Sequence, residues 1–326
     1  MLRKTSTAVI GVGNMGRHHA RVYSELSGAR LLAVADVDET VGQKISEQFK
    51  CRFYSDYEKM LDSERIEALS ICVPTSLHNE VALACIKRRI PVLIEKPIAE
   101  SIKSARAIIG AAKKRKVKIC VGHIERFNPV VNALRRLVLA GKFGEITAVH
   151  SKRAGPFPHQ IFDADVILDL AVHDIDILKY LLRKTPRLVE VRAQKILNTE
   201  RFDYADILLR YGGVDAMVNV DWTISVKIRQ LTLTGTKACA EADYLNQTIK
   251  FYPTVFKKVS RGQSAAKCDK PLSKEIKVRK AEPLKIELEH FLKFVRGERS
   301  EVVLTPDALL TLSLVLKAID WARHHH

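Results

Sequence analysis

The chain has 326 residues, with 54 Lys and Arg against 37 Asp and Glu, and a formal net charge of +17. Apolar residues make up 47% of it, which is ordinary for a globular protein and excludes a mainly disordered chain. No apolar run approaches the roughly 18 residues of a membrane-spanning helix, and the length suggests two domains.

The first part of the chain alternates short apolar segments with amphipathic ones. The apolar segments predict strands at 7–12, 31–35, 68–73, 92–94 and 117–121. Helical periodicity predicts helices at 16–27, 39–49, 77–89 and 101–114. Strands that are apolar throughout and alternate with helices are typical of a parallel sheet covered on both faces. We therefore predict a doubly wound α/β domain of the Rossmann type over residues 1–122.

The pattern changes after Gly122, where strand-like segments follow one another with few helices between them. Strands are predicted at 145–153, 188–196, 204–211, 214–222, 228–235 and 248–251. Helices are predicted at 129–140, 165–182, 283–296 and 305–322. We therefore expect residues 123–303 to form an α+β domain with an open, mostly antiparallel sheet. Residues 324–326, three histidines, look like a purification-tag remnant.

A glycine motif follows the first predicted strand. Residues 11–16 read Gly-Val-Gly-Asn-Met-Gly, which fits G-x-G-x-x-G between a strand and a helix, the context that this motif requires. Gly11 permits a tight turn, Gly13 lets the backbone approach a pyrophosphate, and Gly16 lets the helix pack closely on the strand. The motif therefore predicts a dinucleotide site.

Asp36 ends the second predicted strand, about 20 residues beyond the motif, where an acid is expected to bind the ribose hydroxyls. Its carboxylate would repel a 2′-phosphate, and no Arg follows it at once. The sequence therefore favours NAD over NADP as the cofactor.

Two further segments carry residues suited to acid–base chemistry. Glu95, Lys96 and Pro97 stand at the carboxyl end of an apolar strand, the edge of an open α/β sheet where ligands bind. Asp169 and His173 are four residues apart, so a helix places them on one face. A cation, an orienting carboxylate and a group that titrates near neutral pH are what moving a hydroxyl proton during hydride transfer requires. Taken alone, Glu95 and Lys96 could be an exposed ion pair at a strand end. His173 alone could be a histidine of the core.

Taken together, these residues resemble those of the Gfo/Idh/MocA family of nicotinamide-dependent sugar and inositol oxidoreductases. The resemblance rests on the glycine motif, Asp36, Val73-Pro74-Thr75 with His78, Glu95-Lys96-Pro97, and Asp169 with His173. It implies that Lys96 bonds the reacting oxygen near the nicotinamide, that His173 removes the hydroxyl proton, and that Asp169 positions the substrate.

The resemblance also implies a set of cofactor contacts and an assembly. The implied contacts are Gly11, Gly13, Asn14, Met15, Gly16, Asp36, Pro74, Thr75, His78, Glu95 and Lys96. The last helix, within residues 304–323, is expected to join the first domain. The second sheet is expected to form the interface of a homodimer or homotetramer.

Two segments refine the expected substrate. Residues 122–129 and 152–157 resemble a subgroup of the family that oxidises UDP-N-acetylglucosamine, or its uronic acid, at C3. Asn128 is then expected to bind sugar hydroxyls and Arg153 a diphosphate, beside Lys96, Asp169 and His173. The expected function is NAD-dependent oxidation of a secondary hydroxyl at C3 of a UDP-N-acetylhexosamine. The alternatives are an inositol or free-sugar dehydrogenase of the same family and a non-catalytic NAD-binding sensor.

Other partners fit the sequence less well. The acids and histidine between Asp163 and Asp176 could bind a divalent ion, but nicotinamide chemistry needs no metal, and none is expected. Basic runs such as 113–118 make nucleic acid a candidate, but cations at the end of a predicted helix favour its dipole and extend into water. We expect neither nucleic acid nor a membrane as partner. The N-terminal apolar run is short and no Cys-x-x-Cys pair occurs, so a cytoplasmic protein is expected.

Overall fold

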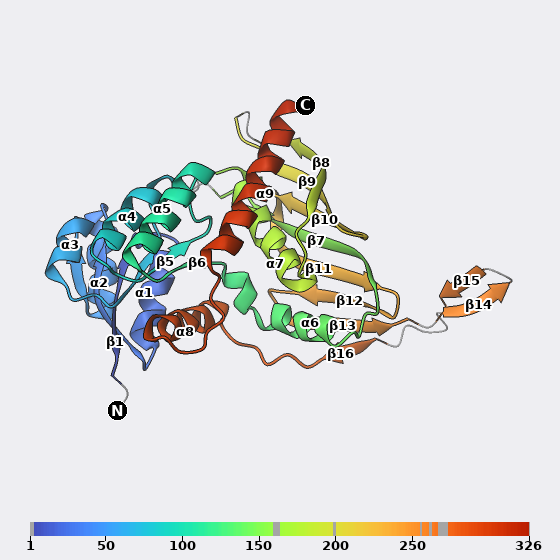
Figure 1. Ribbon diagram of the computed structural model, residues 1–326, viewed down its shortest axis with the longest axis horizontal. Coiled ribbons are helices and arrows are strands. Elements are labelled where there is room, and N and C mark those ends of the chain that lie inside the picture. Colours follow the sequence, from blue (N-terminus) through green and yellow to red (C-terminus); the bar gives the residue numbers. More distant parts are fainter. Residues whose placement is uncertain are drawn as a thin grey trace. The chain divides into compact units, whose positions relative to one another are not determined.

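The computed structural model describes residues 3–158, 164–197, 200–254, 256–260, 263–266 and 273–325 (Figure 1). The chain divides into two compact units. The first unit comprises Met1–Ile124 and Glu282–Ser313, and the second comprises Glu125–Ala281 and Leu314–His326. Within the described residues, no helix is both long and apolar enough to cross a membrane.

The first unit contains a six-stranded sheet in the order β3-β2-β1-β4-β5-β6. Its strands are β1 (Thr5–Ile10), β2 (Ala29–Ala35), β3 (Arg52–Tyr54), β4 (Ala68–Ile71), β5 (Val92–Glu95) and β6 (Ile119–Gly122). Every neighbouring pair is parallel, so the predicted Rossmann-type sheet is confirmed. The strand order reverses between β1 and β4, and ligands of such sheets bind at this switch point.

Helices connect these strands in two groups. The connecting helices are α1 (Gly16–Glu25), α2 (Glu39–Phe49), α3 (Tyr57–Ser63), the 3₁₀ turn η1 (Thr75–Leu77), α4 (His78–Lys87) and α5 (Ile102–Arg115). Helix α4 packs on α5, while α1 packs on α2 and on α8 (Pro283–Arg296). Helices α1 to α5 return the chain to begin the next parallel strand, whereas α8 follows the second unit.

Helix α8 belongs to the first unit, although the sequence assigned residues 283–303 to the second domain. Its residues Leu284, Leu288 and Phe291 are buried in one hydrophobic cluster with Val22 and Tyr23 of α1. This apolar stripe needs a partner, and α1 supplies it across more than 250 residues of sequence. The expected domain boundary was therefore wrong for this helix.

The second unit contains an eight-stranded sheet in the order β16-β13-β12-β11-β7-β10-β9-β8. Its strands are β7 (Ile146–Pro156), β8 (Arg187–Gln194), β9 (Tyr204–Tyr211), β10 (Val214–Asp221), β11 (Thr223–Gly235), β12 (Ala238–Asp243), β13 (Thr248–Pro253) and β16 (Lys274–Ile276). The β7–β10 pair is parallel and the other pairs are antiparallel, which confirms the predicted mostly antiparallel sheet. Strands β14 (Phe256–Ser260) and β15 (Gln263–Ala266) pair separately.

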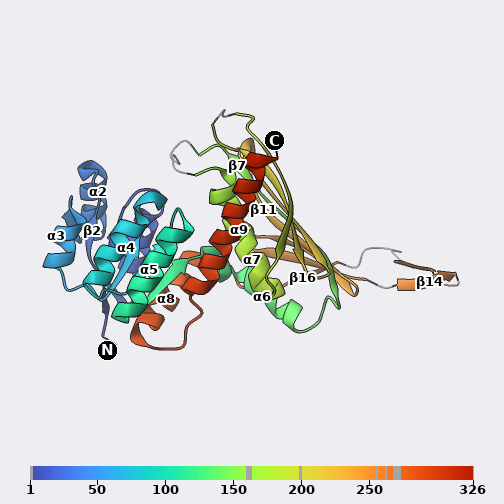
Figure 2. The ribbon, with the colours of Figure 1, turned by 45° about the horizontal axis from the view of Figure 1, so that its top comes forward.

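Helices cover one face of this sheet (Figure 2). They include α6 (Pro129–Leu139) and α7 (Val172–Leu182), which pack on each other. The 3₁₀ turn η2 (Ile124–Phe127) precedes α6, and the π-helical turn η3 (Ile167–Ala171) leads into α7. Burial alternates along β9, as expected for a strand with only one face on the core.

The last helix, α9 (Thr305–His324), is shared between the units. Only its part up to Ser313 belongs to the first unit, so the expectation that the whole helix joins that domain was too broad. Beyond that point, Leu314 and Trp321 line a hollow with Pro186 and Leu188 of the second unit.

Candidate active site

The glycine loop has the geometry that its motif predicts. Gly11 has φ +80°, and a Cβ there would lie 2.8 Å from the backbone of Cys72. A Cβ on Gly16 would lie 1.7 Å from the Gly11 carbonyl oxygen, so only glycine fits at either position. Gly13 differs, because nothing lies within 4 Å of the place that a Cβ would take there, and Gly13 and Asn14 are exposed. Packing therefore does not require a glycine at position 13, whereas a close ligand would.

Asp36 is tied directly to this loop. One of its carboxylate oxygens accepts a 2.6 Å hydrogen bond from the Val12 N–H, and the other accepts one of 3.0 Å from the Asp38 N–H. The side chain is partly exposed, and the next residue, Val37, is 90% exposed. Helix α1 begins nearby at Gly16 without a side-chain cap or an acid in its first turn, so its N-terminal end presents a positive dipole. The loop and Asp36 together suit a dinucleotide.

Lys96 follows β5 at the carboxyl edge of the parallel sheet. It is half-buried, while every other residue from Val92 to Ala99 is buried. The Lys96–Pro97 peptide is cis. Glu95 points into the core, where Oε1 lies 2.9 Å from His19 Nε2 and Oε2 accepts the Lys96 N–H at 3.2 Å. Glu95 was expected to bind the cofactor, but its buried carboxylate is occupied by these internal bonds.

The predicted residues of the β4–α4 connection divide in the same way. Pro74 is exposed and Thr75 is half-exposed, so both can meet a ligand. His78 was expected beside the cofactor, but it is buried, with Nδ1 2.9 Å from the Pro97 carbonyl oxygen and Nε2 3.0 Å from that of Val73. His78 therefore joins two loops at the sheet edge and offers neither ring nitrogen to a cofactor.

Asp169 and His173 lie in the second unit, on the continuous helical segment formed by η3 and α7. From Ala164 to Lys179 they are the two partly exposed residues, and every other residue of that stretch is buried. The predicted common face of the helix is thus the face that opens out of the core. Asp169 occupies a π-helical turn, a distortion that often marks functional sites.

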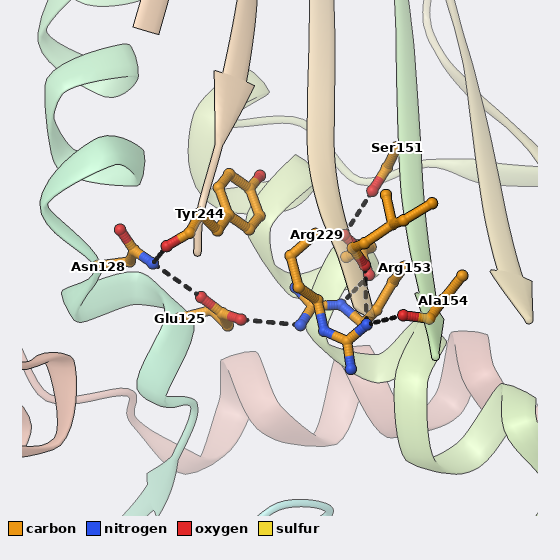
Figure 3. A network of polar contacts seen from close by, with 9 residues as sticks. Glu125, Asn128, Ser151, Arg153, Ala154, Arg229 and Tyr244 are labelled. Carbon is orange, nitrogen blue, oxygen red and sulfur yellow. Dashed lines mark hydrogen bonds and ion pairs between the residues drawn. The ribbon is translucent and has the colours of Figure 1, made fainter. Parts of the chain in front are cut away.

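Arg153 and Asn128 were expected to bind substrate, but both are buried and serve the structure (Figure 3). Arg153 Nε bonds Asp174 at 2.5 Å and its Nη1 bonds Glu125 at 2.8 Å. Asn128 caps α6 by accepting the Val130 N–H, and its amide donates to Glu125 and to the Tyr244 carbonyl. Burial lowers the pKa of Arg153, but Asp174 and Glu125 outweigh it and the pKa lies above the ordinary value.

The same cluster includes Arg229 of β11, which the sequence reading missed (Figure 3). Its Nη1 donates to the carbonyls of Ala154 and Ile228. Burial lowers its pKa to about 10, the Arg153 charge acts in the same direction, and Asp174, Glu125 and Asp169 oppose it. A lone Arg in an alternating strand carries no sequence signal for such a position, because its partners come from other elements.

Two of the acidic residues near Asp169 are paired with arginines rather than open to a metal ion. Asp174 and Asp176 are bound by Arg153 and Arg126, respectively, which removes them from such a group. Asp163 lies outside the described residues. In the part of the chain that the structure describes, no group of three or more His, Cys, Asp or Glu side chains is arranged to hold a metal ion.

A parallel sheet with this loop, acid and strand-end lysine defines the Rossmann class of nicotinamide-binding oxidoreductases. Residues 5–123 match the oxidoreductase family with an NAD-binding Rossmann fold, GFO_IDH_MocA, and residues 131–241 match the Gfo/Idh/MocA C-terminal domain. The chain belongs to the Gfo/Idh/MocA family and is an oxidoreductase, as its sequence motifs predicted.

Two relatives and one solved structure illustrate this membership. The chain is 32% identical to UDP-N-acetylglucosamine 3-dehydrogenase of Acidithiobacillus ferrooxidans, over 76% of each chain. It is 33% identical to inositol 2-dehydrogenase 2 of Saccharopolyspora erythraea, over 53% of this chain and 52% of that one. A solved structure of the Acidithiobacillus enzyme, GnnA, matches with a TM-score of 0.84 and 27% identity over 99% of both chains.

Proposed function

We propose that this protein is an NAD-dependent dehydrogenase that oxidises a secondary hydroxyl at C3 of a UDP-N-acetylhexosamine. One observation carries the catalytic part of the proposal. Lys96, Asp169 and His173 are each partly exposed within segments that are otherwise buried. Three ionisable side chains that leave the core in this way suit a reacting ligand better than they suit packing.

The cofactor part of the proposal rests on the glycine loop. The open space at Gly13, the uncapped N-terminus of α1 and the Asp36 carboxylate fit a pyrophosphate and a ribose with a free 2′-hydroxyl. Pro74 and Thr75, which are exposed and half-exposed, would line the cofactor. When bound, NAD supplies the hydride acceptor. The negative charge of Asp36 disfavours the 2′-phosphate of NADP, which supports the choice of NAD.

The three side chains divide the remaining chemistry. Oxidation of the alcohol removes a hydride from carbon and a proton from the hydroxyl, leaving a C=O bond. His173 takes the hydroxyl proton as general base, because an imidazole titrates near neutral pH. The Lys96 ammonium donates a hydrogen bond to the same oxygen and stabilises the negative charge that develops there. Asp169, one helical turn from His173, orients the substrate hydroxyl and favours the imidazolium that forms.

The relatives support the substrate class. One is a dehydrogenase of UDP-N-acetylglucosamine at C3 and matches most of the chain, whereas the inositol dehydrogenase matches about half. The same residues in the same roles would serve an inositol or a free sugar, which is the second candidate. The homodimer or homotetramer expected from the sequence belongs to the proposal too, and light scattering of the purified protein measures it.

A substrate panel tests the proposal. Formation of NADH would be followed with UDP-N-acetylglucosamine, its uronic acid, free glucose and myo-inositol, each with and without a keto acid that reoxidises retained cofactor. Turnover with a nucleotide sugar alone supports the proposal, and turnover with a free polyol replaces the substrate while keeping the mechanism. No turnover combined with measurable NAD binding would leave the sensor alternative. Parallel assays with NADP test the cofactor preference.

A further inference from the structure

A chain of buried hydrogen bonds lies behind Lys96 in the first unit. Tyr23 Oη lies 2.8 Å from Ser70 Oγ, Ser70 Oγ lies 3.0 Å from His19 Nδ1, and His19 Nε2 lies 2.9 Å from Glu95 Oε1. Helix α1 supplies Tyr23 and His19, β4 supplies Ser70, and β5 supplies Glu95. Tyr23, Ser70 and His19 are fully buried, and Glu95 is 6% exposed. Buried polar side chains have no access to water, so they must form hydrogen bonds with one another.

The donors and acceptors of this chain can be ordered. Among the described residues, Ser70 is the hydrogen-bond partner of Tyr23, so the Tyr23 hydroxyl donates to Ser70 Oγ. In a neutral imidazole, Ser70 then donates to His19 Nδ1 and the ring proton lies on Nε2, facing Glu95. In this arrangement every buried hydrogen has an acceptor, and the last acceptor is the Glu95 carboxylate.

Glu95 is held from two further sides. Its Oε2 accepts the backbone N–H of Lys96 at 3.2 Å. On β6, a Cβ at Gly122 would lie 2.9 Å from Glu95 Oε1, so only glycine leaves room for the carboxylate in this position. Burial raises the pKa of Glu95, but its interactions with His19 and Lys96 outweigh burial, and the pKa lies below the ordinary value. The carboxylate is therefore charged at neutral pH, which strengthens its hydrogen bonds to His19 and to the Lys96 N–H.

We propose that His19 is a positioning residue that fixes the Lys96 backbone at the end of β5 through the Glu95 carboxylate. The importance of Lys96 for turnover rests on the proposed function, whereas the link from His19 to Lys96 rests on the hydrogen bonds alone. His19 lies on α1, the helix that begins at Gly16 of the glycine loop. The link therefore joins the cofactor-binding helix to the strand end that carries the lysine.

The first test measures the backbone and needs no substrate. Hydrogen exchange of the Lys96 amide would be followed by NMR in the full chain. In H19L we expect exchange at least about 10-fold faster, because the Glu95 carboxylate loses its donor and moves. In H19Q the amide nitrogen of glutamine can replace Nε2, and protection should return toward the wild-type value.

Gly122→Ala supplies a second perturbation, in case H19L does not fold. It keeps every polar group but crowds Glu95 Oε1, and we expect faster exchange at Lys96 here too. Gly110→Ala in α5 is the matched control, because nothing lies within 4 Å of its Cβ position and Lys96 should be unaffected. Wild-type exchange at Lys96 in a folded H19L or G122A chain would overturn the proposal.

The second test is a double-mutant cycle in kcat with NAD and UDP-N-acetylglucosamine. We expect H19L to lower kcat about 10- to 100-fold while the KM values change less than about 3-fold, because a displaced lysine weakens the transition state more than the bound ground state. H19L should cause no further loss in a Lys96→Ala background. Equal losses in both backgrounds would refute positioning through Lys96. A fully active Lys96→Ala chain would instead refute the proposed function, and the exchange measurement would still decide the positioning.

Discussion

Each unit places a buried carboxylate next in sequence to a partly exposed residue of the candidate site, but the two carboxylates are held differently. Glu95 precedes Lys96 and bonds an imidazole and a backbone N–H. Asp174 follows His173 and bonds the Arg153 guanidinium and the Ser151 hydroxyl. Lys96 leaves the core because β5 ends at Glu95, whereas the helix sets the neighbouring side chains of His173 and Asp174 about 100° apart. Each geometry buries one neighbour and exposes the other.

The difference between these carboxylates has energetic consequences. The first network relies on hydrogen bonds from an imidazole and a backbone N–H, so losing one donor shifts the geometry and leaves a single charge that Lys96 still attracts. The second network is a buried set of full charges, in which Arg153 faces both Asp174 and Glu125. Removing one ion from such a set leaves its partners as unpaired charges in a poorly solvated environment, which is strongly destabilising. We therefore expect changes in the first unit to appear mainly in catalysis and changes in the second mainly in stability.

The largest effect is expected for Lys96→Ala. Loss of the ammonium that stabilises the developing charge should lower kcat about 10²- to 10⁴-fold, with NAD affinity nearly unchanged. Steady-state kinetics and calorimetric titration with NAD measure the two quantities. Turnover of Lys96→Ala at the wild-type rate would show that Lys96 takes no part in the reaction. It would also contradict the expectation that changes in the first unit act mainly on catalysis.

Arg153→Met should act on stability. Because Asp174 and Glu125 lose a buried partner, we expect the free energy of unfolding to fall by about 3–5 kcal/mol. Urea denaturation measures it, and Arg192→Met is the matched control, because the Arg192–Glu190 pair is on the surface and its loss should not be measurable. If the two variants were equally stable, the buried network would not hold the second unit together.

Asp36→Ala is expected to act mainly on the cofactor, although it also removes the acceptor of the Val12 and Asp38 N–H groups. Loss of the carboxylate removes the ribose acceptor and the charge that repels a 2′-phosphate, so NAD should bind about 10-fold more weakly and the preference against NADP should narrow. Dissociation constants for both cofactors measure this. Glu39→Gln, which removes a nearby exposed charge, is the control. An unaltered ratio between the two cofactors in Asp36→Ala would contradict the ribose role.

The first unit was predictable because its signals are local. The apolar strands, the glycine motif and Asp36 can each be recognised from a few consecutive residues. The parallel sheet followed from the alternation of apolar strands with helices. The misses were elements with weak local patterns. Strand β3 has no buried residue, and β12 is built of small and acidic residues that strands seldom favour.

The residues of the candidate site could be predicted only where the exposure of a side chain follows from the periodicity of its own helix or from the end of its own strand. Asp169 and His173 open to one face as their spacing requires, and Lys96 leaves the core at a strand end. The roles of Asn128, Arg153 and His19 depend on partners 116, 21 and 76 residues away, respectively. A local sequence pattern cannot reveal partners that lie so far away along the chain. Asn128 and Arg153, which are buried, were therefore expected to bind substrate, and the link from His19 to Lys96 was not predicted.

The smallest effect on stability is expected for Gly13→Ala. This substitution distinguishes the glycines that packing of the loop requires from the glycine that cofactor binding requires. Nothing lies within 4 Å of the added methyl group, so the free energy of unfolding should not fall, whereas Gly11→Ala must push against the Cys72 backbone at 2.8 Å and should destabilise the fold. If the space above Gly13 is kept for a pyrophosphate, NAD should still bind several-fold more weakly to Gly13→Ala. Chemical denaturation and NAD titration of both variants test this contrast. Unchanged NAD binding in Gly13→Ala would mean that the phosphates lie elsewhere, even though the loop has the right shape.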